Sequence, residues 1–95
     1  MSRRITQIIA EVAERHEMTP AEITGPWRWK RHCRARYEAM WLARQVMGKD
    51  GKPLYSLPEI GRVFRRDHTT VINALRRHEE QSGIIKPLRD WRRAA

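Results

Sequence analysis

The amino-acid sequence predicts an all-α fold, a compact helical domain that contains a helix-turn-helix. Apolar residues recur at helical spacing near the N-terminus, at Ile5, Ile8, Ile9 and Val12, so they share one face of a helix. Two segments carry a Ser or Thr followed three residues later by Glu, the capping box typical of helix starts. No segment alternates apolar and polar residues as a half-buried strand would.

Length and charge bound the class of protein. The chain has 95 residues, of which 40% are hydrophobic, and this suits a single domain over residues 1–95. Its formal net charge is +9, which favours a polyanionic partner such as DNA, RNA or an acidic membrane surface. One cysteine excludes an internal disulfide, and no segment has the pattern of a signal peptide or membrane span. We therefore expect a cytoplasmic, nucleoid-associated protein without a membrane partner.

The first half of the chain predicts three helices. The N-terminal one runs from Ile5 to His16, and Thr19 begins a short one that Gly25 ends. Residues 27–36 contain no acidic residue, and we expect a basic loop there. A long helix follows over about residues 34–47, and its apolar residues surround much of its girth. A helix of this kind is expected at the centre of the core.

The second half predicts two helices joined by a tight turn. After a glycine-rich loop over residues 48–53, Ser56 begins a helix over about residues 57–64. Asp67 can cap the next helix, which continues to about Glu80. A last short helix is expected over residues 85–92, with Leu88 and Trp91 as its packing residues.

The pair of helices over about 57–80 has the arrangement of a helix-turn-helix. In this motif the first turn of the second helix points into the major groove, where side chains must be short and polar to read base edges. The second helix begins with such side chains. The predicted major-groove residues are Arg66, Asp67, His68, Thr69 and Thr70. For Asp67 a purely structural role as helix cap stays open.

Two stretches resemble the signature of a known family. Residues 56–64, SLPEIGRVF, and 66–71, RDHTTV, are similar to the C-terminal DNA-binding domain of DnaA, the bacterial chromosomal replication initiator. The upstream match includes Arg34, Arg36 and residues 39–44. The resemblance extends from Ile5 to about Glu80, and it implies a Trp-repressor-like helical fold with double-stranded DNA as the partner.

The resemblance also implies roles for individual residues on an asymmetric DNA site. The run from Arg66 to Thr70 enters the major groove. Leu57 and Pro58 meet the phosphate backbone, where main-chain N–H groups near the start of the helix bind phosphate. Arg65, which the family pattern lacks, is predicted separately to add a phosphate contact. The basic segment reaches a minor groove, with Arg36 as its leading residue. The other predicted contacts of that segment are Arg28, Lys30, Arg31 and Arg34.

The chain departs from the family's pattern in two respects. The family has two glycines where this chain has only Arg65, so the turn is one residue shorter and carries an extra charge. We expect the shorter turn to tilt the recognition helix or to add a phosphate contact. The glycine-rich phosphate loop of the family's ATPase part is also missing from the 95 residues. The chain is therefore expected to be a stand-alone regulator of transcription or replication initiation in a bacterium or phage.

Several alternatives remain at this stage. The basic segment can be a merely solvated surface, and packing is favoured over base stacking for Trp27 and Trp29. A protein-interaction module that acts on replication-regulatory proteins is the second functional hypothesis, and an RNA-binding protein or an enzyme is the third. No metal is expected, because His32 and Cys33 lack further ligands at metal-binding spacing. No catalytic residues, cofactor or small-molecule substrate are expected either, since the sequence shows no acidic cluster of a nuclease and no nucleophile–base set.

Overall fold

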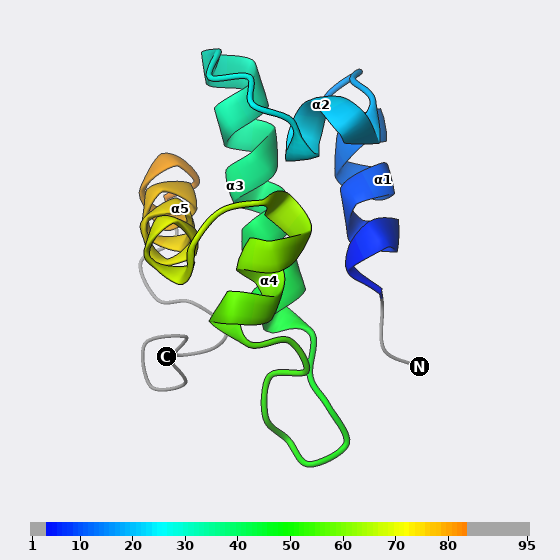
Figure 1. Cartoon of the computed structure of the whole chain (residues 1–95), viewed down its shortest axis with the longest axis vertical. Coiled ribbons are helices and arrows are strands. Elements are labelled where there is room, and N and C mark those ends of the chain that lie inside the picture. Colours follow the sequence, from blue (N-terminus) through cyan, green and yellow to red (C-terminus); the bar gives the residue numbers. More distant parts are fainter. Residues whose placement is uncertain (1–3, 84–95) are drawn as a thin grey trace.

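The computed structural model describes residues 4–83, which form five helices (Figure 1). These are α1 Ile5–Arg15, α2 Pro20–Thr24, α3 Lys30–Gln45, α4 Leu57–Phe64 and α5 His68–Gln81. Apart from a single bridge between Met47 and Pro53, the described residues form no β-structure. The prediction of an all-α fold is confirmed. The helix predicted over residues 85–92, with Leu88 and Trp91, lies outside the described residues.

Helix α3 is the central element, because it contacts all four other helices. In Figure 1 it stands between α1 and α5, with α4 in front of it. Ala35, Ala39 and Ala43 recur along it every four residues and are fully buried. Small side chains at this spacing let neighbouring helices approach closely. The predicted central position of the long helix is confirmed.

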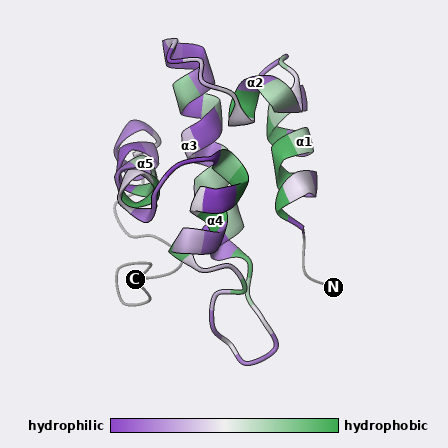
Figure 2. Ribbon diagram, viewed as in Figure 1, coloured by the Kyte–Doolittle hydropathy of each residue, from purple (hydrophilic) through white to green (hydrophobic). Residues whose placement is uncertain are grey.

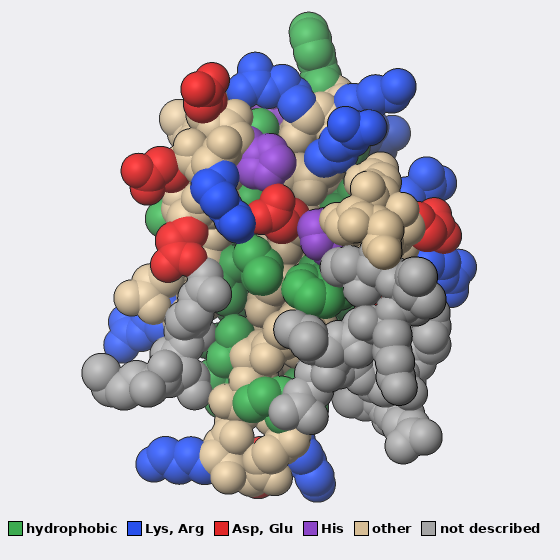
Figure 3. Space-filling model, turned by 180° about the vertical axis from the view of Figure 1, so that it is seen from behind, with side chains coloured by type: hydrophobic (Ala, Val, Ile, Leu, Met, Phe, Trp, Pro, Cys, Tyr) green, Lys and Arg blue, Asp and Glu red, His purple; other side chains and the backbone are tan. Residues whose placement is uncertain are grey.

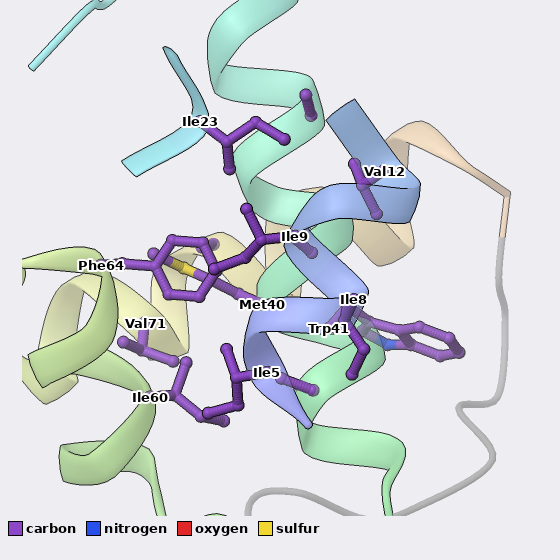
Figure 4. Packing of buried hydrophobic residues seen from close by; sticks show 14 of the residues in the cluster. Ile5, Ile8, Ile9, Val12, Ile23, Met40, Trp41, Ile60, Phe64 and Val71 are labelled. Atoms are coloured by element: carbon purple, nitrogen blue, oxygen red, sulfur yellow. The ribbon is translucent and has the colours of Figure 1, made fainter. Parts of the chain in front are cut away.

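Side chains from all five helices form the core. Figure 4 shows Ile60 and Phe64 of α4 directed towards Ile5 and Ile9 of α1, with Met40 of α3 beside Phe64. These side chains are almost completely buried. Figure 2 shows where the hydrophilic residues lie: the first turns of α3 and the connection between α4 and α5 are hydrophilic. Two polar segments that are distant in sequence therefore lie outside the core.

Local sequence signals set the helix starts. Thr19 accepts a hydrogen bond from the Glu22 N–H at 3.2 Å, and the Glu22 carboxylate accepts one from the Thr19 N–H. Ser56 and Glu59 form the same pair of bonds at the start of α4. Both predicted capping boxes are confirmed. The pKa of Glu22 is lowered, first by its hydrogen bond with His32 and then by the hydrogen bonds with Thr19. The pKa of Glu59 is lowered by its hydrogen bonds with Ser56.

The boundaries of the long helix were predicted incorrectly. Helix α3 begins at Lys30 and ends at Gln45, so most of the predicted basic loop over residues 27–36 is helical. Lys, Arg and Ala all have good helix propensity, and no helix breaker follows Pro26 in this stretch. Trp29 is the N-cap residue, with extended backbone angles. The irregular part of the basic segment is therefore short and lies before Lys30.

Candidate nucleic-acid interface

Residues 65–67 connect the two helices of the motif. Arg65 ends α4 in the left-handed conformation, with φ 58° and ψ 41°. The Arg66 N–H then donates to the Gly61 carbonyl at 2.8 Å, which closes the turn. Left-handed backbone is costly for residues other than glycine. The exposed Arg65 therefore stands at a position whose backbone conformation favours glycine.

Gly61 allows α4 to touch this turn. A Cβ atom at Gly61 would lie 2.4 Å from the Arg66 carbonyl oxygen, which is far inside van der Waals contact. The neighbouring atoms are main chain and have no rotamer to change. Glycine is thus required here by close approach of the backbone.

The Arg66 side chain folds back against the protein. Its guanidinium donates to the carbonyls of Thr24 at 3.2 Å, Gly25 at 2.8 Å and Phe64 at 2.5 Å. The pKa of Arg66 is lowered mainly because the side chain is partly buried, and secondly because the charged guanidinium of Arg36 lies nearby. In this conformation Arg66 ties the turn to the segment after α2. A base contact by Arg66 would require its side chain to leave these carbonyls, and this contact stays a prediction.

The expectation for Arg36 needs correction. Its side chain is only 4% exposed, and it cannot extend into a groove from this position. The guanidinium donates to the carbonyls of Ile23 at 2.7 Å, Gly25 at 3.0 Å and Trp27 at 2.9 Å. These carbonyls end α2 and begin the loop, and they need donors once they are buried. Arg36 therefore organises the loop from inside.

The first turn of α5 presents the expected polar side chains. His68, Thr69 and Thr70 are all exposed. The Asp67 carboxylate accepts a hydrogen bond from the Thr70 N–H at 2.8 Å, and this bond lowers the pKa of Asp67. Asp67 is therefore the N-cap of α5. Base contacts by these four residues stay a prediction.

The exposed stripe of α5 continues beyond its first turn. Asn73, Arg76, Arg77 and Glu80 line a shallow depression of about 390 Å³. Asn73 follows Thr69 and Thr70 at helical spacing, and Arg76 and Arg77 follow Asn73 in the same way. These residues were not among the predicted contacts. Continuing the helical spacing from Thr70 along the predicted helix would have found them.

Two hollows join the basic segment to the motif. One, of about 230 Å³, lies between the start of α3 and α5, and its lining is Arg28, Lys30, Cys33, Arg34, Tyr37, Arg77 and Gln81. The other, of about 400 Å³, is lined by Thr24, Gly25, Pro26, Arg28, Arg65 and Arg66. Neither lining contains an acidic residue. Arg28 is exposed and lines both hollows, so it links the motif turn with the side of α5.

The remaining residues predicted to contact DNA lie in different parts of the structure. Lys30 and Arg34 are exposed and line the smaller hollow. Arg31 instead donates to the carbonyls of His16 and Glu17, at 3.1 and 3.3 Å, and so binds the end of α1. At the start of α4, Leu57 is buried and Pro58 is exposed. A phosphate contact at Leu57 is therefore open only to its main chain.

The described residues also bear on metal binding and on membrane insertion. Within residues 4–83, no group of three or more His, Cys, Asp or Glu side chains is placed to hold a metal ion. Across the same stretch, every helix is too short or too polar to cross a membrane.

Comparison with known proteins identifies the family. A family model described as the bacterial dnaA protein helix-turn-helix matches residues 5–77. The chromosomal replication initiator protein DnaA of a Ruegeria species is 42% identical over 85 residues, which are 86% of this chain and 17% of that protein. DnaA of Thermus thermophilus is 36% identical over 92 residues, 88% of this chain and 20% of its own length. DnaA of Caulobacter vibrioides is 42% identical over 80 residues, with 81% and 15% covered.

The match covers α1 to α4 and most of α5, and therefore nearly all of the motif described above. The chain spans about a fifth or less of the length of these relatives. The family resemblance predicted from residues 56–71 is confirmed, and the chain belongs to the bacterial DnaA helix-turn-helix family.

Proposed function

We propose that this chain binds double-stranded DNA with sequence specificity and places α5 in the major groove. One observation carries the proposal. The exposed polar first turn of α5 adjoins a surface of Arg28 and Arg65 that is free of acidic residues. Short polar side chains suit base edges, and the surrounding cations suit phosphates. Membership of the family supports the same function.

Contacts with base edges and contacts with phosphates are made by different residues. His68, Thr69 and Thr70 read base edges, and the Thr methyl groups can also contact a thymine methyl. Asn73 is one turn further along the stripe and is suited to a bidentate contact with adenine. Arg34, Arg65 and Arg77 bind phosphates and so set the register without reading sequence.

Arg28 takes the minor-groove role first expected of Arg36. It is exposed in the short irregular part of the basic segment, next to the turn of the motif. An extended Arg side chain favours a narrow minor groove, where the negative potential is strongest. Arg36 contributes by holding the loop from which Arg28 projects.

The biological role is proposed from the relatives. Their name, chromosomal replication initiator protein DnaA, points to sites of the kind that such initiators bind. We propose that DNA binding by this chain regulates replication initiation or transcription in a bacterium or phage. The protein acts as a nucleoid-associated component of the cytoplasm, without catalytic activity of its own.

Selection of bound sequences from a random duplex library at near-physiological salt tests the proposal. The wild-type chain is expected to recover an asymmetric motif. Thr69→Ala is expected to relax the motif at one position, because it removes a base contact. Thr6→Ala is the matched control, since Thr6 is exposed on α1.

Two results would contradict the proposal in different ways. Binding without any motif, lost as salt rises, would indicate a nonspecific electrostatic binder. No binding to duplex DNA at all would make interaction with replication-regulatory proteins the leading hypothesis.

A further inference from the structure

Trp29 is the most exposed large hydrophobic residue among those that the structure describes. Its side chain is 72% exposed, although packing was the role expected from the sequence. It lies between Arg28 and Lys30, which both line the smaller basic hollow. A large aromatic ring left in water is costly and often marks a contact surface.

The main chain that carries Trp29 is held from several directions. Arg36 donates to the carbonyl of the nearby Trp27 at 2.9 Å. The Trp27 ring stacks on His32, with ring centres 6.1 Å apart and planes 21° apart. His32 in turn shares a 2.8 Å hydrogen bond with Glu22. A fixed backbone with an exposed ring is preorganised for binding, since little freedom remains to be lost.

The charges around Trp29 identify the chemistry of its partner. Residues 23–37 include no Asp or Glu. Figure 3 shows Lys and Arg side chains gathered at the end of the molecule where α3 begins, with a hydrophobic side chain projecting among them. An apolar protein surface would desolvate these cations without compensation. Duplex DNA offers phosphates for the cations and base faces or sugars for the ring.

The position of the loop relative to the motif favours DNA over an acidic membrane surface. Arg28, next to Trp29, lines one hollow with Arg65 and another with Arg77. A duplex bound along α5 therefore passes beside Arg28, and Trp29 follows directly in the chain. Proteins that enter minor grooves often insert an apolar side chain between base steps.

We propose that Trp29 is a DNA-contact residue whose indole ring wedges into the minor groove beside Arg28. This inference rests on the proposed function. Insertion unstacks a base step, and pyrimidine–purine steps unstack most easily. Trp29 therefore adds a preference for such a step at the edge of the site, and its contribution is apolar and independent of salt.

Titration of the full chain with its selected duplex, at several salt concentrations, tests this contact. Trp29→Ala is expected to weaken binding about tenfold at every salt concentration, a size typical of one lost aromatic stacking contact. Trp29→Phe is expected to keep most of the affinity. Arg28→Ala is the charged comparison, and it should reduce the slope of log affinity against log salt by about one.

The chain also offers an apolar control. Leu54 is 39% exposed in the loop beyond the other end of α3. The 16 residues of α3 separate the two loops by about 24 Å. Leu54→Ala is therefore expected to bind DNA like the wild type.

A duplex with 2-aminopurine at the flanking step tests the wedge itself. Fluorescence should rise when wild-type protein binds and should not rise with Trp29→Ala, because insertion unstacks the probe. Three results would each overturn the inference. Trp29→Ala could bind with unchanged affinity, Trp29→Ala could change the salt slope as Arg28→Ala does, or the fluorescence could fail to rise with wild-type protein. In all three cases wild-type binding to the duplex would leave the proposed function standing, whereas loss of wild-type binding would refute both.

Discussion

Arg36 and Arg66 donate hydrogen bonds to the same acceptor, the carbonyl oxygen of Gly25, at 3.0 and 2.8 Å. One side chain comes from α3 and the other from the turn between α4 and α5. Two guanidinium groups repel each other, but three carbonyls around each of them compensate. The loop after α2 and the turn of the motif are thereby held together, so the two predicted DNA-binding segments keep a defined relative position.

Replacement of Arg36 by Met tests its internal role. The variant removes the Arg36 donors from the carbonyls of Ile23 and Trp27, and it is expected to lose roughly 3 kcal/mol of unfolding free energy. Urea denaturation followed by circular dichroism measures the loss. Arg34→Met is the control, because Arg34 is exposed on the same helix and should change stability by less than about 0.5 kcal/mol. Normal stability of Arg36→Met together with weak DNA binding would instead restore the minor-groove role.

Gly61→Ala is expected to disrupt the contact between α4 and the turn. The new methyl group would lie 2.4 Å from the Arg66 carbonyl oxygen, so the backbone must shift. We expect a loss of about 2 kcal/mol in unfolding free energy, and weaker DNA binding because α5 moves. Val63→Ala, at an exposed position of the same helix, serves as the control. Stability equal to wild type would mean that α4 and the turn separate easily.

Arg65→Gly is expected to stabilise the protein. Arg65 has a φ of 58°, a conformation that costs non-glycine residues about 1–2 kcal/mol, so glycine should recover about 1 kcal/mol. Arg62→Gly, inside α4, should have the opposite sign, with a loss of about 1 kcal/mol. Denaturation of both variants gives the comparison. If Arg65 also binds a phosphate, Arg65→Gly should lower the salt slope of DNA binding by about one.

The cap of α5 predicts a pH-dependent stability. The hydrogen bond from the Thr70 N–H lowers the pKa of Asp67 below its ordinary value of about 3.9. A lowered pKa in the folded state means that the stabilisation is present above the ordinary value and is lost as pH falls through the lowered one. Asn also caps helices but carries no charge. Asp67→Asn should therefore differ from wild type most at pH 6 and least near pH 2, and a difference independent of pH would contradict the charge effect.

The sequence by itself determined the capped helix starts and the motif. Ser56 with Glu59, and Thr19 with Glu22, mark helix starts because a capping box is formed by residues close together in the chain. Asp67 caps α5 for the same local reason. The family signature also lies within one continuous stretch.

Only the tertiary structure decided which arginines face outwards. Arg28, Arg36 and Arg66 have the same side chain, and two of them turn inwards because the carbonyls that end α2 lie within their reach. Those carbonyls are distant in sequence, and no spacing along the chain reveals them. Trp29 is likewise exposed because α3 begins at Lys30 and leaves its ring outside the core. Local hydrogen bonds set the elements, whereas the direction of long side chains depends on packing between elements.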